Sequence, residues 1–132
     1  MLVALMTDIH GNREAFEACL EDATARGAGR YVFLGDYVGY GPDPGFVVDT
    51  VRAHVAAGAL ALMGNHDEAA LGRDEGMNAL ARAAIAWTRQ RLDPGQLEFL
   101  AGLPLTLTEG EFLYVHANAW APGGWDYVTS SI

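Results

Sequence analysis

Three short apolar runs in the first half of the chain each end abruptly in polar side chains. The runs Leu2–Thr7, Tyr31–Leu34 and Ala59–Met63 end in Asp8-Ile9-His10, in Gly35-Asp36 and in Gly64-Asn65-His66-Asp67. Continuous apolar runs of this length are typical of parallel strands buried on both faces. In an open α/β sheet, ligands bind outside the carboxyl ends of the strands. We therefore expect the three polar ends to converge at one edge of a parallel sheet.

The segments between these runs carry the apolar spacing of helices. Asn12 is expected to cap a helix that ends at Gly27, and Asp43-Pro44 opens a second helix that stops at Gly58. Residues 1–65 therefore predict a β-α-β-α-β unit with right-handed crossovers. The predicted buried stripes are Phe16, Cys19, Leu20 and Ala23 in the first helix, and Val47, Val48, Val51 and Val55 in the second, with His54 solvated.

The second half predicts further helices and a hairpin. A short helix is expected over 68–71, and a longer one capped by Asn78 carries Leu80, Ala84, Trp87, Arg91 and Leu92 on one side. Asp93-Pro94 opens another short helix, which ends near Gly102. Two strands flank Glu109-Gly110, and the second ends at His116. The predicted fold class is α/β, with a βαβαβ parallel core and a hairpin in one domain, residues 1–132.

Charge and composition narrow the class of function. The net charge of −9 argues against an extended nucleic-acid surface, although a phosphate substrate remains compatible if metal ions supply positive charge. The single cysteine allows no intramolecular disulfide, which is typical of a reducing compartment. The opening run has no basic segment before it, and no stretch is long enough to cross a bilayer. We expect a cytoplasmic protein without membrane partners.

The residues at the strand ends form a set of metal-ligand types. Asp8, His10, Asp36, Asn65 and His116 offer oxygen and imidazole nitrogen without thiolate, which suits Mn, Fe, Zn or similar ions. A carboxylate such as Asp36 can bridge two ions. Two ions about 4 Å apart lower the pKa of a shared water and favour displacement at phosphorus. Any one of these motifs alone is more often a turn former or a hydrogen-bonded surface residue, but the ordered set is hard to obtain by chance.

Taken together, the motifs resemble one known family. Asp8-Ile9-His10, Gly35-Asp36, Gly64-Asn65-His66-Asp67 and Val115-His116 are similar to the motif series of the calcineurin-like metallophosphoesterases. The loop of residues 36–44 resembles the small bacterial and archaeal phosphodiesterase-like branch. The resemblance implies the N-terminal part of a four-layer αββα sandwich, because the G-H-x-H motif and the later strands of the family are absent after His116.

The resemblance also implies a role for each motif residue. Asp8 and His10 would hold one ion, Asp36 would bridge, and Asn65 and His116 would hold the other. The ions would be two divalent transition metals (Mn, Fe, Zn or Ni), with Mn as the first expectation. His66 would face the substrate and Asp67 would orient its imidazole. The implied reaction is hydrolysis of a phosphodiester or phosphomonoester, including those of nucleotides, by a metal-bridging hydroxide.

Two other interpretations stay open. Without the two later histidines, the chain could be a catalytically silent metal-binding fragment or subunit, and uncovered apolar sheet surface would favour homo-oligomers. Gly39-x-Gly41-x-x-Pro44 is a near miss of the dinucleotide-binding fingerprint. It lacks the third glycine, its loop is long, and Asp36 would repel a pyrophosphate in the absence of metal.

Overall fold

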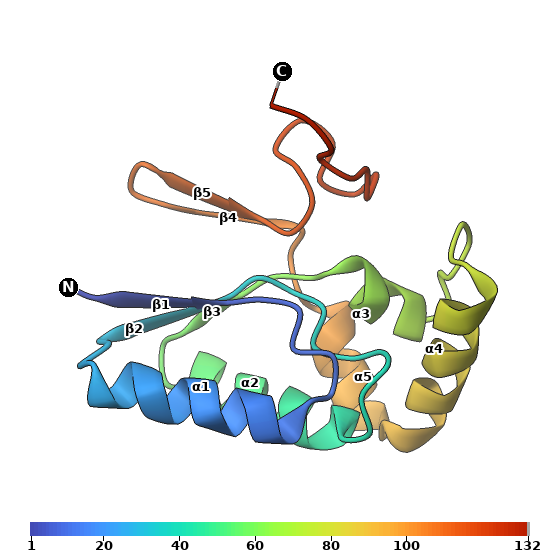
Figure 1. The fold of residues 1–132 in the computed structure, drawn as a ribbon, viewed down its shortest axis with the longest axis horizontal. Helices are drawn as coiled ribbons and strands as arrows, with labels where there is room; N and C mark the ends of the chain where they lie inside the picture. Colours follow the sequence, from blue (N-terminus) through green and yellow to red (C-terminus); the bar gives the residue numbers. More distant parts are fainter. Residues whose placement is uncertain (132) are drawn as a thin grey trace.

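The computed structural model describes residues 1–131 and has the predicted α/β class (Figure 1). Its elements are β1 (Val3–Met6), α1 (Arg13–Ala25), β2 (Arg30–Phe33), α2 (Pro44–Ala56), β3 (Leu60–Ala61), α3 (Asn65–Ala70), α4 (Ala79–Arg91), α5 (Pro94–Ala101), β4 (Thr106–Glu109) and β5 (Phe112–Val115). In this described range, no helix is long and apolar enough to cross a membrane.

The strands form two separate sheets. The first is parallel and has the order β1-β2-β3. The second is the antiparallel hairpin β4-β5, in which Glu109 pairs with Phe112. Gly110 lies in the turn with a φ of 59°, a left-handed conformation that glycine adopts without steric cost. The parallel core and the hairpin are therefore confirmed.

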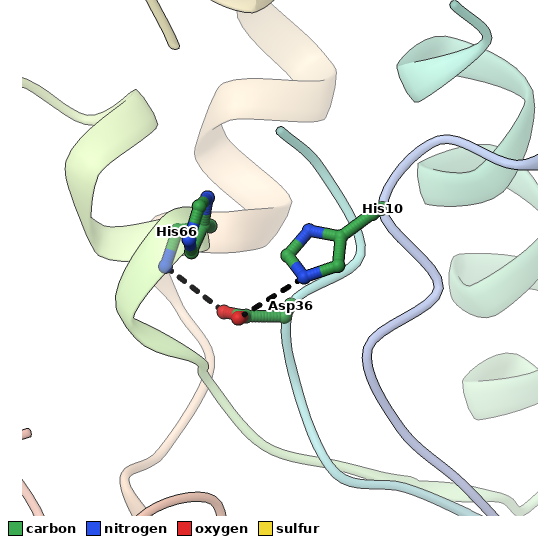
Figure 2. Close-up of side chains that lie close together, drawn as sticks. All are labelled: His10, Asp36 and His66. Atoms are coloured by element: carbon green, nitrogen blue, oxygen red, sulfur yellow. Dashed lines mark hydrogen bonds and ion pairs between the residues drawn. The ribbon is translucent and has the colours of Figure 1, made fainter. Parts of the chain in front are cut away.

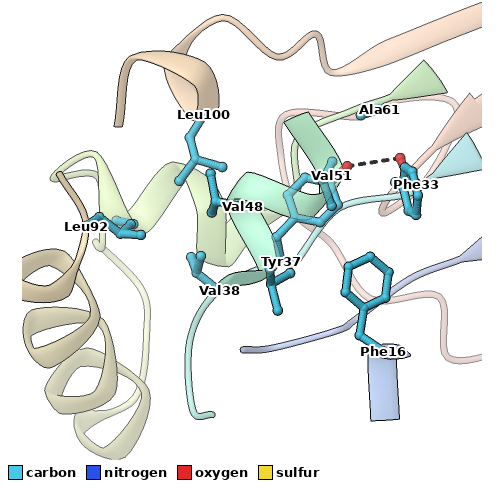
Figure 3. Packing of buried hydrophobic residues seen from close by; sticks show 11 residues of the cluster. Phe16, Phe33, Tyr37, Val38, Val48, Val51, Ala61, Leu92 and Leu100 are labelled. Atoms are coloured by element: carbon cyan, nitrogen blue, oxygen red, sulfur yellow. Dashed lines mark hydrogen bonds between the residues drawn. The ribbon is translucent and has the colours of Figure 1, made fainter. Parts of the chain in front are cut away.

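Helices α1 and α2 cover one side of the parallel sheet, and the hairpin lies on the other side (Figure 1). Between sheet and helices is a cluster of buried side chains that includes Phe33, Val48, Val51 and Leu100 (Figure 3). Tyr37 is also buried there, and its hydroxyl bonds the carbonyls of β2 and of the segment after β3. Each large apolar side chain buried in this way contributes about 1.5–3 kcal/mol, and the cluster holds the strand ends in place.

The first strand differs from its prediction. β1 lies at an edge of the sheet that the described residues form and is not buried on both faces as predicted, because Leu2 and Leu5 are 52% and 57% exposed. Helix α1 packs over this edge, so only part of its apolar stripe is covered. Phe16 and Ala23 are buried, whereas Cys19 is exposed and is not the core residue that the spacing predicted.

Helix α4 also buries a different face from the predicted one. Ala81, Ile85 and Thr88 are buried, while Leu80 is 76% and Trp87 38% exposed. The buried face meets α3, where small side chains allow the two helices to approach closely. Leu80 and Trp87 therefore lie off the packed side, whereas Leu92, also on the predicted side, is buried.

Two local predictions need smaller corrections. Helix α3 begins at Asn65, three residues earlier than expected, so a candidate ligand lies in its first turn. His54 is half-buried instead of solvated, because its ring packs edge-on against Tyr31 and Phe33. Its Nδ1 lies 2.8 Å from the carbonyl oxygen of Thr50.

Candidate metal centre

The polar strand ends converge at the carboxyl edge of the parallel sheet. The backbone N–H of Asp8 donates to the carbonyl of Gly35 at 3.0 Å, and that of His10 donates to the carbonyl of Asp36 at 2.9 Å. These bonds continue the pairing of β1 and β2 beyond the sheet. The loops after the two strands are therefore held side by side.

Three of the predicted ligands have an unusual backbone conformation. Asp8, His10 and Asp36 have φ values of 55°, 49° and 58°. Residues other than glycine rarely adopt the left-handed region, and such strain concentrates at functional sites. Here the conformation turns each chain segment sharply at the end of its strand, so that the side chain faces the shared edge.

The site contains two groups of potential metal donors that share Asp36. One group is His10, Asp36 and His66, and the other is Asp8, Asp36 and His116. In each group the ligand atoms all lie within 4.8 Å of one another. The Nε2 atom of His10 lies 3.5 Å from Asp36 Oδ2 (Figure 2). The same atom lies 3.6 Å from Asp8 Oδ1. The Nε2 atom of His116 lies 3.4 Å from the same Asp36 oxygen.

Backbone carbonyls orient the rings of His10 and His116. The Nδ1 atom of His10 lies 2.9 Å from the carbonyl oxygen of Val38, and that of His116 lies 2.7 Å from the carbonyl oxygen of Leu34. A proton on Nδ1 donates to each carbonyl, which leaves the Nε2 lone pair directed at the site. Metal-binding histidines are commonly held in this way.

The fifth predicted ligand, Asn65, lies with the second group. Its carboxamide is 3.1 Å from the Nε2 atom of His116. Hard oxygen and imidazole donors around one buried carboxylate fit divalent first-row ions. The structure thus brings together all five predicted ligands, and it adds the ring of His66 to the neighbourhood of Asp36.

The electrostatics of the centre are dominated by Asp36, which is 3% exposed. Burial acts to raise the pKa of Asp36, but the neighbouring His116 lowers it below its ordinary value. Burial acts to lower the pKa of His116, and the contact with Asp36 outweighs this and raises it to about 9. A positive charge next to Asp36 is therefore strongly favoured, whether a proton or a metal ion supplies it.

Asp67 lies in a different place from the one predicted. Its carboxylate accepts hydrogen bonds from the backbone N–H groups of Asp36 at 2.8 Å, Tyr37 at 2.9 Å and Gly64 at 2.9 Å. It makes no bond to the imidazole of His66, so the predicted orienting pair is wrong in its geometry. Burial raises the pKa of Asp67 to about 7. Its position indicates that it holds the loop after β2 against the start of α3.

His66 packs against two other rings, which also contact each other. Its ring centroid is 4.7 Å from that of His10 and 5.0 Å from that of Tyr40. Among the described residues its buried Nδ1 atom has no hydrogen-bond partner. A Cβ atom on Gly39 would lie only 2.5 Å from this nitrogen, so a glycine is needed for the close approach. Burial lowers the pKa of His66.

Two residues near the centre were missed as site candidates. Tyr40 packs edge-on against His10 and has a φ of 63°. Its place between Gly39 and Gly41 in the polar loop was the available signal. Glu68 accepts the indole N–H of Trp125, whose ring lies 6.0 Å edge-on from that of His116. No sequence spacing links Glu68 to Trp125, so this contact needed the structure.

Comparison with known proteins identifies the family. The calcineurin-like phosphoesterase family matches residues 1–129. The chain belongs to the calcineurin-like phosphoesterases. This membership confirms the resemblance based on the strand-end motifs, and it agrees with a sheet whose carboxyl edge carries histidines and carboxylates.

Relatives of this calcineurin-like phosphoesterase are longer than the chain itself. An uncharacterised protein of Methanocaldococcus jannaschii is 35% identical over 96% of the chain, which spans 54% of that protein. A metallophosphoesterase from Sphaerobacter thermophilus has a TM-score of 0.80 at 37% identity, covering 96% of this chain and 50% of that one. A protein provisionally named a diadenosine tetraphosphatase has a TM-score of 0.60 at 29% identity, covering 79% and 43%. The chain therefore spans about half the length of these relatives.

Proposed function

We propose that this chain provides the metal centre of a phosphoesterase that hydrolyses phosphodiesters or phosphomonoesters. The observation that carries the proposal is the position of Asp36, which is buried and shared by two groups of donors. Asp8 and His10, whose side chains lie 3.6 Å apart, would hold one divalent ion. Asn65 and His116, whose side chains lie 3.1 Å apart, would hold the other, with Asp36 shared. Donors of oxygen and imidazole nitrogen suit Mn, Fe, Zn or Ni, and Mn²⁺ is the first of these to test.

The residues of the centre would have different roles in hydrolysis. Two divalent ions bound there would activate water for attack on phosphorus and offset the charge of the phosphate. His66 faces the open side of the centre and would contact the phosphoryl oxygens or the leaving oxygen. Asp67 would keep the loop of Asp36 in register with α3 through its bonds to backbone amides.

The proposed substrate is a small phosphate ester, including nucleotides, and the proposed compartment is the cytoplasm. The acidic surface supports this choice, since a net charge of −9 disfavours long nucleic acids. The relative provisionally named a diadenosine tetraphosphatase supports a nucleotide-like substrate. We further propose that residues 1–132 are one part of a longer domain of this family, as the length of the relatives suggests.

The test is hydrolysis of bis-p-nitrophenyl phosphate by the chain with added Mn²⁺. The control is Asp36→Asn, which keeps an oxygen able to accept the N–H of His66, a bond of 2.9 Å. Circular dichroism checks that the variant folds. We expect turnover that depends on Mn²⁺ and falls at least about 100-fold in the variant. Equal Mn²⁺ content and equal turnover in both proteins would refute the proposal.

One observation favours a second candidate. Residues 117–132 contain no histidine, so residues 1–132 by themselves would offer each ion fewer imidazole ligands than the family motif provides. The chain could then bind metal without turning over substrate. Mn²⁺ bound stoichiometrically by the chain and lost in Asp36→Asn, together with no hydrolysis in either protein, is the result that selects this candidate.

A further inference from the structure

The open side of the candidate centre divides into two hollows. A hollow of about 250 Å³ includes Asp8, His116 and Asp126. A larger one of about 380 Å³ includes His66 and Arg73. Both are bordered by Asn65, Trp125 and Tyr127, so the aromatic side chains separate them. The larger hollow has the size of small-molecule sites, which are about 300–1,000 Å³.

The two hollows differ in charge. Arg73 is the only arginine among the described residues that border either one, and it lies in the larger hollow together with one carboxylate, Glu75, whereas the smaller hollow has two aspartates and no basic side chain other than His116. The Arg73 side chain is 74% exposed, and its Nη1 atom lies 3.4 Å from Glu68 Oε1. An exposed ion pair of this kind is weak. A phosphate group can therefore replace Glu68 as the partner of Arg73, through charge-assisted hydrogen bonds.

The walls of the larger hollow offer flat aromatic surface. Tyr40 is 53% and Tyr127 87% exposed, and Trp125 is half-buried beside them. Exposed aromatic rings bordering a polar hollow are suited to stacking on a base. His66 borders this hollow and not the smaller one. A substrate in the larger hollow can therefore place its ester bond beside His66.

We propose that the larger hollow binds the nucleoside side of a nucleoside phosphate ester. The base stacks on Trp125 and Tyr127, and a phosphate beyond the one at the centre pairs with Arg73. This assignment rests on the proposed function and names its substrate class. In the reaction, a water oxygen forms a bond to phosphorus and the ester P–O bond breaks. The leaving oxygen keeps the electron pair and takes up the proton that the water releases.

Equilibrium dialysis of ADP with the Mn²⁺-supplied chain tests the assignment without requiring turnover. Arg73→Gln and Trp125→Leu are each expected to weaken ADP binding at least about fivefold. Trp125→Phe keeps a flat ring and retains most of the binding. Pyrophosphate has no base, so we expect its binding to weaken in Arg73→Gln and to stay unchanged in Trp125→Leu. The matched control for Arg73→Gln is Arg82→Gln, since Arg82 also pairs with an aspartate, Asp74. The matched control for Trp125→Leu is Trp120→Leu. Neither Arg82 nor Trp120 borders the hollow.

The outcomes separate this assignment from the proposed function. Loss of ADP binding in both variants supports the assignment, even if bis-p-nitrophenyl phosphate is not hydrolysed. Hydrolysis together with unchanged ADP affinity in both variants overturns the assignment and leaves the function standing. Tighter binding of phosphotyrosine than of ADP also overturns the assignment. Phosphotyrosine has no second phosphate for Arg73, so the assignment predicts that it binds more weakly than ADP. If Trp125→Leu lowers stability, Tyr127→Leu replaces it, since that side chain is 87% exposed.

Discussion

The parallel core and the hairpin both contain strands rich in large apolar residues, β2 and β5, but the surroundings of these strands differ. Phe33 and Leu62, in the core, are fully buried. Phe112 and Leu113, in β5, are 68% and 51% exposed. Both regions contribute residues to the candidate centre. Only the residues that come from the core are supported by a packed apolar interior. The difference shows that an apolar run indicates a strand, whereas burial depends on which other elements cover it.

Polar contacts link the hairpin to the core. The N–H of Met63 donates to the carbonyl of Pro104 at 2.8 Å, just before β4. At the other end, His116 bonds the carbonyl of Leu34. Arg30 of β2 pairs with Glu109 of β4. The hairpin therefore positions His116 with little apolar burial of its own.

Truncation of one phenylalanine in each region gives the largest expected contrast. Phe33→Ala should lower the free energy of unfolding by about 3–5 kcal/mol, because it leaves a cavity in a fully packed core. Phe112→Ala should change it by about 0.5 kcal/mol or less, since most of that ring is exposed. Urea titration followed by circular dichroism measures both. Similar losses in the two variants would contradict the contrast.

Asp67 links the loop after β2 to α3 within the core. Asp67→Ala leaves three buried backbone N–H groups without their acceptor and should cost about 3 kcal/mol. The matched control is Asp93→Ala, which removes an exposed helix cap that accepts from Gln96 and should cost about 1 kcal/mol. Thermal unfolding of the two variants compares them. A smaller loss for Asp67→Ala than for Asp93→Ala would show that Asp67 has no structural role.

Metal ions should join the two regions, because the proposed ligands come from both. At a Mn²⁺ concentration 100 times its dissociation constant, the free energy of unfolding should rise by about 2.7 kcal/mol. Asp36→Asn should remove most of this gain, and chelation by EDTA should reverse it. Lowering the pH should weaken the effect, because protons compete for His116, whose pKa is raised to about 9. Differential scanning calorimetry with and without Mn²⁺ provides the measurement.

The smallest expected effect concerns the ion pair between the sheets. Arg30 and Glu109 are partly exposed, so their coupling should be about 1 kcal/mol or less. A double-mutant cycle of Arg30→Ala and Glu109→Ala isolates it. Coupling well above this value would mean that the pair fixes the hairpin on the core. No coupling would mean that the hairpin is attached to the core mainly through the bonds of His116 and of Pro104, which precedes β4.

The strand-end residues were predictable because their order and spacing define the topology. Asp8, Asp36 and Asn65 each follow a short apolar run of strand length, and parallel strands bring such ends together. Caps were equally accessible, and Asn12 and Asn78 both accept from the amide three residues later. Local chemistry fixes both kinds of feature without knowledge of distant packing.

Burial and side-chain partners were less predictable. The sequence of β1 is apolar throughout, and nothing local indicates that it lies at the edge of the described sheet. In α4, the small residues Ala81 and Thr88 are buried while Trp87 is partly exposed, because the neighbouring helix decides the face. Asp67 sits next to His66 in sequence, but helical geometry directs its carboxylate to backbone amides instead. Such choices depend on contacts between distant segments.

The left-handed conformation of the proposed ligands has a consequence for how the protein can change over time. A non-glycine residue held there costs about 1–3 kcal/mol, so the backbone conformation alone would favour glycine at Asp8, His10 and Asp36. Replacement of Asp8 by glycine would relax the backbone while removing a proposed ligand. If Asp8 is a ligand as proposed, a copy of this gene released from the demand for metal binding would therefore gain stability by the same substitution that removes the ligand. Loss of function along such a lineage would be hard to reverse, because each restored ligand would bring its strain back.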